Sequence, residues 1–292
     1  MSKFKVFMEM IKFEHTIFAL PFAFLGTFLG ARYLQPQGWP TWSQLFWVTM
    51  AMVGARTAAM ALNRLIDRHI DAKNPRTAVR AIPKGLLKTG EVYLYIILSF
   101  ALLAVSAYQL NMLCLELMPI AVFFLTLYSY TKRFTWACHL ILGIADGLAP
   151  LGGWIAITGS FDYQGVLLGL LVGTWIAGFD IIYSCQDSDF DKSLGLHSIP
   201  TRFGIAKALQ ISIWLHVLTA LLFVAVGIVL NLGLFYYLGV LVALVILYKQ
   251  HTMVAPDDLS KLNFAFFNMN GYLSLIVFAF TLLELVFPIR IM

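Results

Sequence analysis

Long apolar runs alternate with short polar connections over the whole chain. Nine runs come close to the roughly 20 residues that a helix needs to cross a bilayer. They fall at about 16–34, 42–62, 92–110, 117–131, 136–158, 164–183, 208–230, 234–248 and 265–287. The breaks between them contain residues typical of turns, such as Pro36-Gln-Gly38 and Asn231-Leu-Gly233. The pattern predicts an all-α polytopic membrane protein with nine transmembrane helices, because helices satisfy their own backbone polar groups in lipid.

Composition agrees with this class. Of the 292 residues, 60% are hydrophobic and 12% are charged, and the mean hydropathy is +0.82. These values exclude a water-soluble domain, and we expect residues 1–292 to form one transmembrane domain whose partner is the lipid bilayer. No small-residue cleavage site follows residues 1–12, which favours a first membrane helix over a removed signal peptide.

Charge is distributed unevenly over the connections. If the amino terminus is cytoplasmic, 17 of the 20 Lys and Arg residues fall on the inner side. This asymmetry, rather than binding to nucleic acid, explains the net charge of +5. The long polar connections 63–91, 184–207 and 249–263 all lie on that side. We therefore expect a multi-pass protein of the cell (inner) membrane, with an external carboxyl terminus and a cavity that opens toward the cytoplasm.

The first candidate site directly follows the second apolar run. There Asn63, Asp67 and Asp71 have the spacing i, i+4 and i+8, so they share one stripe of a continuing helix. Two carboxylates one turn apart repel each other unless a cation lies between them, and Mg²⁺ prefers oxygen ligands and shares them with phosphates. Basic residues between Arg64 and Lys88, among them Arg80, suit an anionic substrate. The alternative for an isolated motif is a solvated loop with structural ion pairs.

A second acidic motif ends the sixth apolar run and favours the metal interpretation. Asp180, Tyr183, Asp187 and Asp191 have the spacing i, i+3, i+7 and i+11, again on one helical face. Its last two acids repeat the carboxylate pair of the first motif at the same membrane face. Acids at the membrane are costly and usually functional. Two such pairs predict Mg²⁺ ions held on both sides of a diphosphate.

These two motifs, on the second and sixth of nine spans, resemble those of the UbiA superfamily of intramembrane aromatic prenyltransferases. The resemblance covers essentially the whole chain. It extends to Glu14-His15-Thr16, Asn74-Pro75-Arg76-Thr77 and Tyr130-Thr-Lys132-Arg133. The family often has Asn-Asp where this chain has Asn63-Arg64, which leaves the acids intact but changes the neighbouring contact. Asp146 lies outside the shared pattern, and we expect it either to line the cavity or to pair with a buried base such as Arg56.

The resemblance implies transfer of a polyprenyl group from polyprenyl diphosphate to an aromatic acid. Mg²⁺ would be held by Asp67, Asp71, Asp187 and Asp191. The diphosphate would be bound by Asn63, Lys132, Arg133 and Arg80. Asp180 and Tyr183 would contact the acceptor or assist removal of its proton, and Lys12 and His15 could receive its carboxylate.

Three functions remain open from the sequence. The first is prenylation of 4-hydroxybenzoate in quinone biosynthesis. The second is prenylation of a dihydroxynaphthoate in a menaquinone pathway, because the Asn63-Arg-Leu-Ile-Asp67 opening and the Gly195-Leu-His-Ser-Ile-Pro200 tail resemble that branch as well. The third is an ion-coupled transporter. It is disfavoured because both acid pairs lie at one membrane face, whereas transporter sites lie near the midplane. The sequence does not indicate the prenyl chain length or the oligomeric state.

Overall fold

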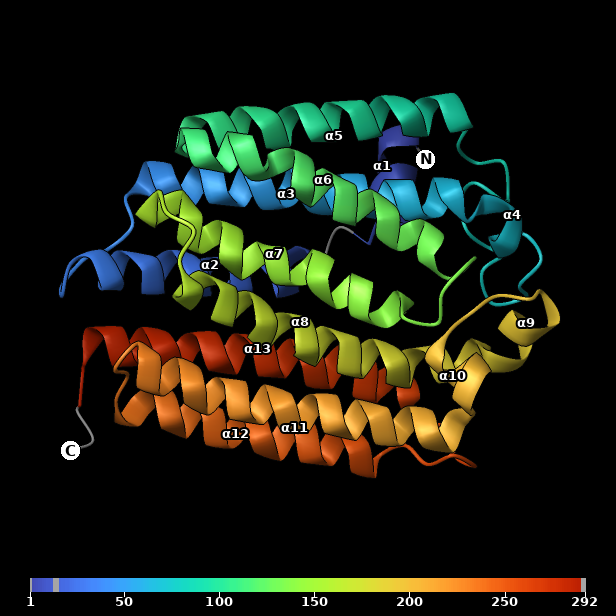
Figure 1. Cartoon of the computed structure of the whole chain (residues 1–292). Coiled ribbons are helices and arrows are strands. Elements are labelled where there is room, and N and C mark those ends of the chain that lie inside the picture. Colours follow the sequence, from blue (N-terminus) through green and yellow to red (C-terminus); the bar gives the residue numbers. More distant parts are fainter. Residues whose placement is uncertain (1, 13–15, 290–292) are drawn as a thin grey trace.

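Long antiparallel helices make up most of the molecule (Figure 1). The computed structural model describes residues 2–12 and 16–289. Within these residues the long helices are α2 (Thr16–Leu34), α3 (Trp42–Ile66), α5 (Thr89–Leu110), α6 (Met112–Thr131), α7 (Cys138–Thr158), α8 (Tyr163–Ser184), α11 (Ile205–Val229), α12 (Leu234–Thr252) and α13 (Leu262–Val286). The shorter elements are α1 (Lys3–Met10), α4 (Arg68–Asp71), the 3₁₀ turn η2 (Cys185–Asp187), α9 (Ser188–Ser193) and α10 (Ile199–Phe203).

The predicted all-helical membrane fold is confirmed. In the described part of the chain, eight helices are long and apolar enough to cross a membrane. In the ninth, α2, the part whose side chains the structure describes is apolar over Leu20–Leu34. The predicted start of the fourth span at 117 is five residues late, because Asn111 caps α6 directly after α5: its Oδ1 accepts a hydrogen bond of 2.9 Å from the Cys114 N–H. The second span is longer than predicted and continues to Ile66.

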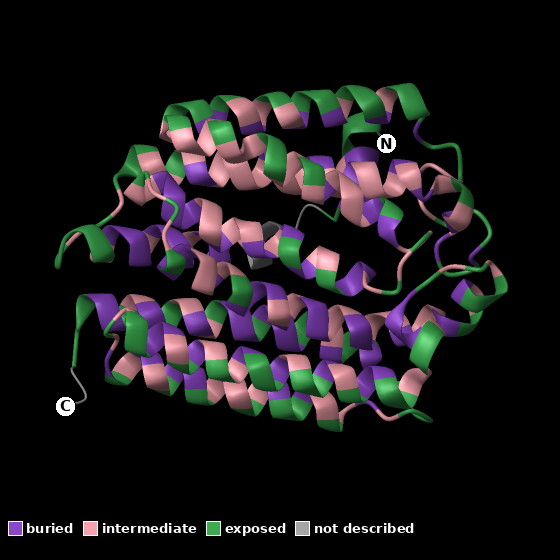
Figure 2. Cartoon of the chain, viewed as in Figure 1, coloured by how far each residue is buried: buried purple, intermediate pink, exposed green. Residues whose placement is uncertain are grey.

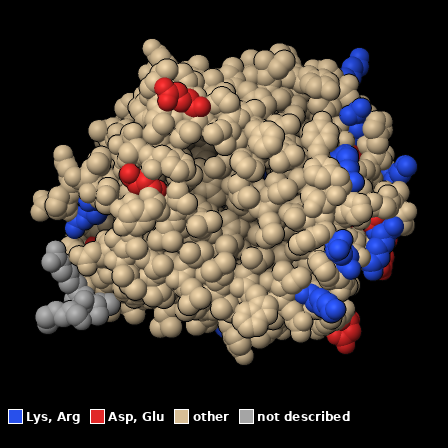
Figure 3. Space-filling view, in the orientation of Figure 1, with Lys and Arg blue, Asp and Glu red and all other residues tan. Residues whose placement is uncertain are grey.

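The long connections gather at one end of the bundle. Connections 67–88, 185–204 and 253–261 meet there and form what we call the polar end, whereas turns 35–41, 159–162 and 230–233 lie at the opposite end. Most of the visible Lys and Arg side chains lie at the polar end (Figure 3). The structure thus separates the two faces as the charge pattern predicts. Assignment of the polar end to the cytoplasm stays a prediction.

The outer faces of the bundle are exposed (Figure 2) and carry many large apolar side chains. Among these residues, Ile97 on α5, Leu221 on α11 and Tyr248 on α12 are 64%, 63% and 71% exposed. Exposed apolar area on this scale is unusual for a soluble monomer. These faces are therefore the surface that contacts lipid.

A short helix that the apolar pattern did not predict packs at the polar end. In α1, Val6, Phe7 and Met10 are buried, and the Phe7 ring stacks on Tyr95 of α5 with 4.0 Å between ring centroids. Lys3 Nζ also donates a hydrogen bond of 2.9 Å to the Leu86 carbonyl. These contacts fix α1 beside the connection that carries the first acidic motif.

Helices α7 and α8 meet along a row of glycines, which we call the glycine seam: Gly143 and Gly147 of α7 against Gly173 and Gly169 of α8. A Cβ atom at Gly143 would lie 2.3 Å from the Gly173 carbonyl oxygen, and one at Gly147 would lie 2.4 Å from that of Gly169. The backbones are therefore in direct contact, as small residues four apart allow in membrane helices. The seam sets the relative position of the two helices that build the centre of the site.

Candidate active site

A cavity of about 1230 Å³ opens between the helices. Its described lining comes from α1–α3, the 67–88 connection, α5–α9 and α13, and includes no residue of α11 or α12. It extends from Asp71 and Asp191 at the polar end to Leu110 and Phe161 near the opposite end. This volume exceeds the roughly 300–1000 Å³ of most ligand pockets. A polar mouth with a long apolar interior suits an amphiphile with a charged head and a hydrocarbon tail.

The first acidic motif lies at the mouth of the cavity. Helix α3 ends at Ile66, yet the Asp67 N–H still bonds the Asn63 carbonyl at 2.9 Å and the Asp71 N–H bonds that of Asp67 at 2.8 Å. The predicted spacing of one turn therefore survives the break. Asp67 and Asp71 line the cavity and are only 3% and 5% exposed.

Asp67 is surrounded by three of the residues predicted to bind diphosphate. Arg133 Nη2 lies 2.8 Å from Asp67 Oδ1, and Lys132 Nζ lies 3.6 Å from Oδ2. Asn63 Nδ2 donates to the same Oδ2 at 3.1 Å. The basic pair between α6 and α7 thus reaches the acidic motif that ends α3. A buried carboxylate needs such partners, because an uncompensated charge in a low dielectric is costly.

Asp71 has its own counter-ion in the fourth of these predicted residues. Arg80 Nη1 lies 2.7 Å from both carboxylate oxygens. Thr77 Oγ1 donates a hydrogen bond of 3.0 Å to the Asp71 carbonyl and holds the connecting loop against the motif. All four predicted diphosphate ligands therefore contact an acid of the first motif: three contact Asp67 and Arg80 contacts Asp71.

The second motif departs from the single helical face that its spacing predicts. Helix α8 ends at Ser184, the chain tightens into the 3₁₀ turn η2 at 185–187, and α9 then begins at Ser188. A 3₁₀ turn has about three residues per turn, so it rotates the later acids relative to Asp180. Asp180, Tyr183, Asp187 and Asp191 nevertheless all line the cavity.

Arg76 joins the two motifs, and sequence reasoning gave it no individual role. Its Nε and Nη2 donate to the two oxygens of Asp187 at 3.1 and 2.5 Å, and its Nη1 donates to the Tyr183 hydroxyl at 3.2 Å. Asn74 Nδ2 adds a bond of 3.3 Å to Asp187. Burial lowers the pKa of Arg76, but the hydrogen bond and the charge of Asp187 outweigh it and raise the pKa overall. The Asn74-Pro75-Arg76-Thr77 segment was the available signal.

Asp191 differs from the other three acids. It is 8% exposed, and its carboxylate has no hydrogen bond or ion pair to any residue that the structure describes. Its strongest electrostatic neighbours are Lys132 and Asp187, followed by His139 and Asp67. An acid held among other acids without a direct partner suits a bound cation.

The donor set fits Mg²⁺ in its chemistry. Four carboxylates and the amides of Asn63 and Asn74 line one end of the cavity, and hard divalent cations prefer oxygen ligands of this kind. In residues 2–12 and 16–289, however, no three His, Cys, Asp or Glu side chains form a compact metal-binding group. Arginine side chains instead occupy the oxygens of Asp71 and Asp187. Each of these carboxylates keeps further lone pairs that a bound cation could use.

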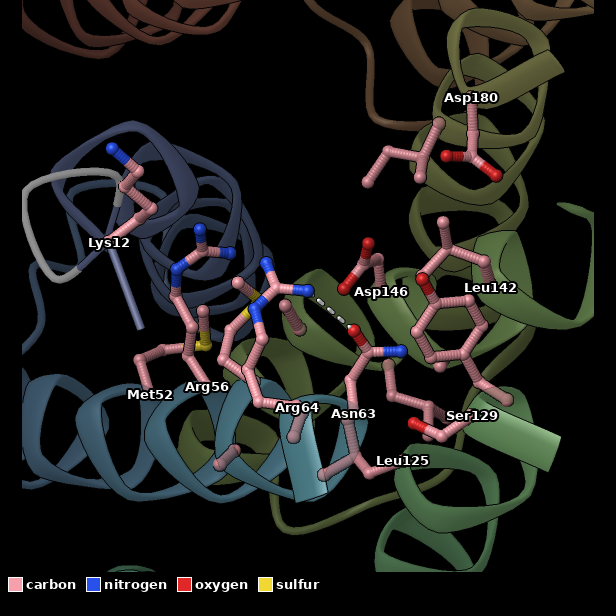
Figure 4. Close-up of a pocket in the computed structure, with 18 of the residues that line it drawn as sticks. Lys12, Met52, Arg56, Asn63, Arg64, Leu125, Ser129, Leu142, Asp146 and Asp180 are labelled. Atoms are coloured by element: carbon pink, nitrogen blue, oxygen red, sulfur yellow. Dashed lines mark hydrogen bonds between the residues drawn. The ribbon is translucent and has the colours of Figure 1, made fainter. Parts of the chain in front are cut away.

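A second polar cluster lies deeper in the cavity (Figure 4). Arg56 and Arg64 extend from α3, with Asp146 of α7 between them and Asp180 of α8. Asp146 lines the cavity, as one of the two expectations has it, and lies within electrostatic reach of Arg56 without forming an ion pair with it. Arg56 Nε is buried and has no hydrogen-bond partner among the described residues. Arg64 Nη1 donates to Asn63 Oδ1 at 2.8 Å, which is the altered contact that the Asn63-Arg64 sequence implied.

The remaining predicted residues divide between the two ends of this cluster. Lys12 lines the cavity on the side of Arg56 (Figure 4), and His15 lies outside the described residues. Tyr183 stacks on Phe266 of α13 with 4.0 Å between centroids. Asp180 pairs with His139, which sequence reasoning missed because the two lie 41 residues apart with no recognisable spacing.

Replacing Arg76 by Gln should lower turnover about ten- to hundredfold, the range expected for losing a charge-assisted hydrogen bond worth about 1.5–3 kcal/mol. The bond to Asp187 organises the second motif, so the loss should appear in the rate of product formation by purified protein. Lys192→Gln is the matched control, because Lys192 is exposed on α9 and does not line the cavity. Equal rates of product formation by the Arg76→Gln and Lys192→Gln variants would show that turnover does not depend on Arg76.

The sequence of this chain is similar to those of known proteins. The model of the UbiA prenyltransferase family matches residues 22–272. A 4-hydroxybenzoate octaprenyltransferase of Vibrio cholerae is 32% identical over 261 residues, covering 88% of this chain and 89% of the relative. One of Yersinia pseudotuberculosis is 30% identical over 281 residues, with 95% of each chain covered.

Solved structures give the same picture. The apo structure of a UbiA homologue from Aeropyrum pernix K1 superposes with a TM-score of 0.84 at 32% identity, covering 93% of this chain and 98% of that one. A UbiA homologue from Archaeoglobus fulgidus bound to GPP and Mg²⁺ has a TM-score of 0.74 at 18% identity, covering 98% and 100%. The second likeness shows a shared fold.

Proposed function

This chain is a multi-pass membrane protein that belongs to the UbiA prenyltransferase family, and we propose that it transfers a polyprenyl group from polyprenyl diphosphate to 4-hydroxybenzoate and releases diphosphate. The observation that carries the proposal is the cavity itself. Two carboxylate motifs from distant parts of the chain line its polar end, and an apolar chamber lies behind them. The V. cholerae and Y. pseudotuberculosis relatives bear the name of this activity.

The prenyl donor would bind with its diphosphate at the polar end and its tail in the apolar chamber. Mg²⁺ held by Asp67, Asp71, Asp187 and Asp191 would neutralise the charge that develops on the leaving diphosphate. Lys132, Arg133, Arg80 and Asn63 would contact the diphosphate once it enters. The apolar walls exclude water, so the allylic cation left behind meets the acceptor instead of being hydrolysed.

The acceptor would lie deeper, among the second polar cluster. The guanidinium of Arg56, whose Nε has no hydrogen-bond partner within residues 2–12 and 16–289, and the ammonium of Lys12 suit a carboxylate. Asp180 stands on the opposite side (Figure 4), where the ring would attack the allylic cation, and Tyr183 also lines the cavity. A dihydroxynaphthoate remains a second candidate acceptor, because half-buried Arg64 adds a further cation beside Arg56 and the chamber has room for a bicyclic ring.

We place the polar end in the cytoplasm of a cell whose inner membrane holds the protein, on the ground of the basic residues gathered there. A diphosphate head would then approach from the cytoplasmic face, while its tail stays in lipid.

Activity in detergent tests the proposal. Purified protein given Mg²⁺, a labelled polyprenyl diphosphate and a panel of aromatic acids should form prenylated 4-hydroxybenzoate and one equivalent of diphosphate, without any ion gradient. Chelation of the metal with EDTA should abolish turnover, and added Mg²⁺ should restore it. Mass spectrometry of the products identifies the acceptor, so preferential prenylation of a dihydroxynaphthoate would move the assignment to that acid.

An ion-coupled transporter would behave differently. It would need a sealed vesicle with two compartments, and its acids would cycle through protonation during transport. Gradient-driven uptake without a covalent product from any aromatic acid would overturn the proposal.

A further inference from the structure

Asp180 belongs to the second acidic motif but is not among the four acids predicted to hold the metal, and its partner is His139. His139 stands in the first turn of α7 and Asp180 in the last turn of α8, and His139 Nδ1 lies 2.6 Å from Asp180 Oδ2. The side chain of His139 is 4% exposed and that of Asp180 is 20% exposed. Both line the cavity, and the carboxylate is the more exposed of the two groups.

The glycine seam positions this pair. His139 precedes Gly143 by one helical turn on α7, and a Cβ at Gly143 would lie 3.1 Å from the Ala177 Cβ on α8, one turn before Asp180. The pair is thus the next contact along the seam toward the polar end. Because the two backbones are in contact, the distance between imidazole and carboxylate is set by rigid elements instead of loops.

The contacts around the imidazole accommodate a proton on each ring nitrogen. The Ser184 hydroxyl donates its one proton to the Ile181 carbonyl at 2.8 Å, so its oxygen is available to accept from His139 Nε2, which lies 3.4 Å away. Nδ1 lies within hydrogen-bond distance of the Asp180 carboxylate. This arrangement suits an imidazolium that faces a carboxylate.

The acids of the cavity differ in what neutralises them. Asp67 and Asp71 are paired with Lys and Arg residues that we place at the diphosphate, and Asp187 is paired with Arg76. The partner of Asp180 is instead the buried histidine His139. Across the cavity, Asp180 lies within electrostatic reach of Tyr128 and Asp146. This acid is therefore on the acceptor side of the site.

We propose that His139 is a positioning residue that keeps Asp180 ionised and oriented as the base that removes the ring proton of the acceptor. The inference rests on the proposed prenyl transfer. Attack of the ring on the allylic cation forms the new carbon–carbon bond. The C–H bond at that ring carbon then breaks, its electron pair restores the aromatic ring, and the proton passes to Asp180. It leaves to water with the product, and His139 stays protonated throughout.

The physical need for His139 follows from the surroundings. A carboxylate in a mostly apolar cavity tends to take up a proton, and a protonated Asp180 could accept nothing from the ring. Protonated His139 stabilises the ionised form of Asp180 through one carboxylate oxygen and leaves the other oxygen available to the acceptor. The second hydrogen bond, from Nε2 to Ser184, keeps the ring from turning away.

Kinetics with a deuterated acceptor test the inference. His139→Gln keeps a hydrogen-bond donor but loses the charge, and it should lower kcat by about two orders of magnitude, as expected for an impaired general base. KM for the prenyl diphosphate should change little. Deuterium at the prenylated ring carbon should give no primary isotope effect in the native enzyme and a normal one in His139→Gln, because proton removal becomes rate-limiting. His197→Gln is the control, since His197 is exposed and does not line the cavity.

A double variant separates positioning from simple support of the fold. If His139 acts through Asp180, His139→Gln combined with Asp180→Asn should be no slower than Asp180→Asn alone. Additive losses, or a slow His139→Gln enzyme without an isotope effect, would overturn the inference. If His139→Gln does not fold, Ser184→Ala replaces it and should show the same isotope effect with a smaller loss, whose absence would also overturn the inference. Failure of the native enzyme to prenylate any acceptor would instead count against the proposed function.

Discussion

Asp191→Asn should lose at least about two orders of magnitude in turnover, as is typical when one electrostatic contact to a reacting group is removed. The substitution keeps the size of the side chain and removes the charge that would hold Mg²⁺ against a diphosphate. Asp191 is buried among Lys132, Asp187 and Asp67 and has no direct partner in the described chain. Its loss therefore breaks no hydrogen bond, and folding should survive. Asp67→Asn should show a comparable loss of turnover, although it also weakens the contact with Arg133.

Rates at saturating Mg²⁺, together with thermal unfolding in detergent, check this result. Asp189→Asn is the matched control, because Asp189 lies two residues away on the same short helix but is exposed and absent from the cavity lining. Native-like turnover by Asp191→Asn would contradict the mechanism based on two acidic motifs.

Gly147→Ala should have the largest effect on stability. The added Cβ would lie 2.4 Å from the Gly169 carbonyl oxygen, far inside van der Waals contact. Backbone cannot rotate away as a side chain can, so α7 and α8 must separate. We expect a loss of at least about 1–3 kcal/mol, the usual cost of overpacking, read as a lower melting temperature in detergent.

Gly152→Ala provides a control on the same helix. A Cβ at Gly152 has nothing within 4 Å, and alanine is favoured over glycine in a helix by up to about 1 kcal/mol. Its melting temperature should stay the same or rise. Equal behaviour of the two variants would show that the seam does not hold the helices together.

Features that depend on local spacing could be predicted from the sequence. The lengths of the apolar runs predicted the transmembrane helices. The predicted spacing of Asp67 and Asp71 is also found in the structure, because the backbone hydrogen bonds between these residues keep the helical pattern. The convergence of the two motifs on one cavity also followed, since both end helices that point to the same membrane face.

Features that depend on contacts between helices could not be predicted in this way. No periodicity within α7 or α8 identifies His139 as the partner of Asp180, because the contact arises where antiparallel helices cross. The bridge from Arg76 to Asp187 spans 111 residues and depends on how a loop folds back. The 3₁₀ turn at 185–187 could not be predicted from the spacing of the acids. That spacing assumes the same rotation per residue as in an α-helix, and a 3₁₀ turn has a different one.

The glycine seam has a consequence for how the protein is made. Helices α7 and α8 follow each other in the chain and are joined by the short turn 159–162, so their contact needs nothing that is synthesised later. The hairpin can close in the membrane while α11, α12 and α13 are still to be translated. Closing it brings His139 to Asp180 and leaves the second acidic motif at its end. A central part of the site can thus form once α8 has been synthesised. The last three helices then pack against a hairpin that has already formed.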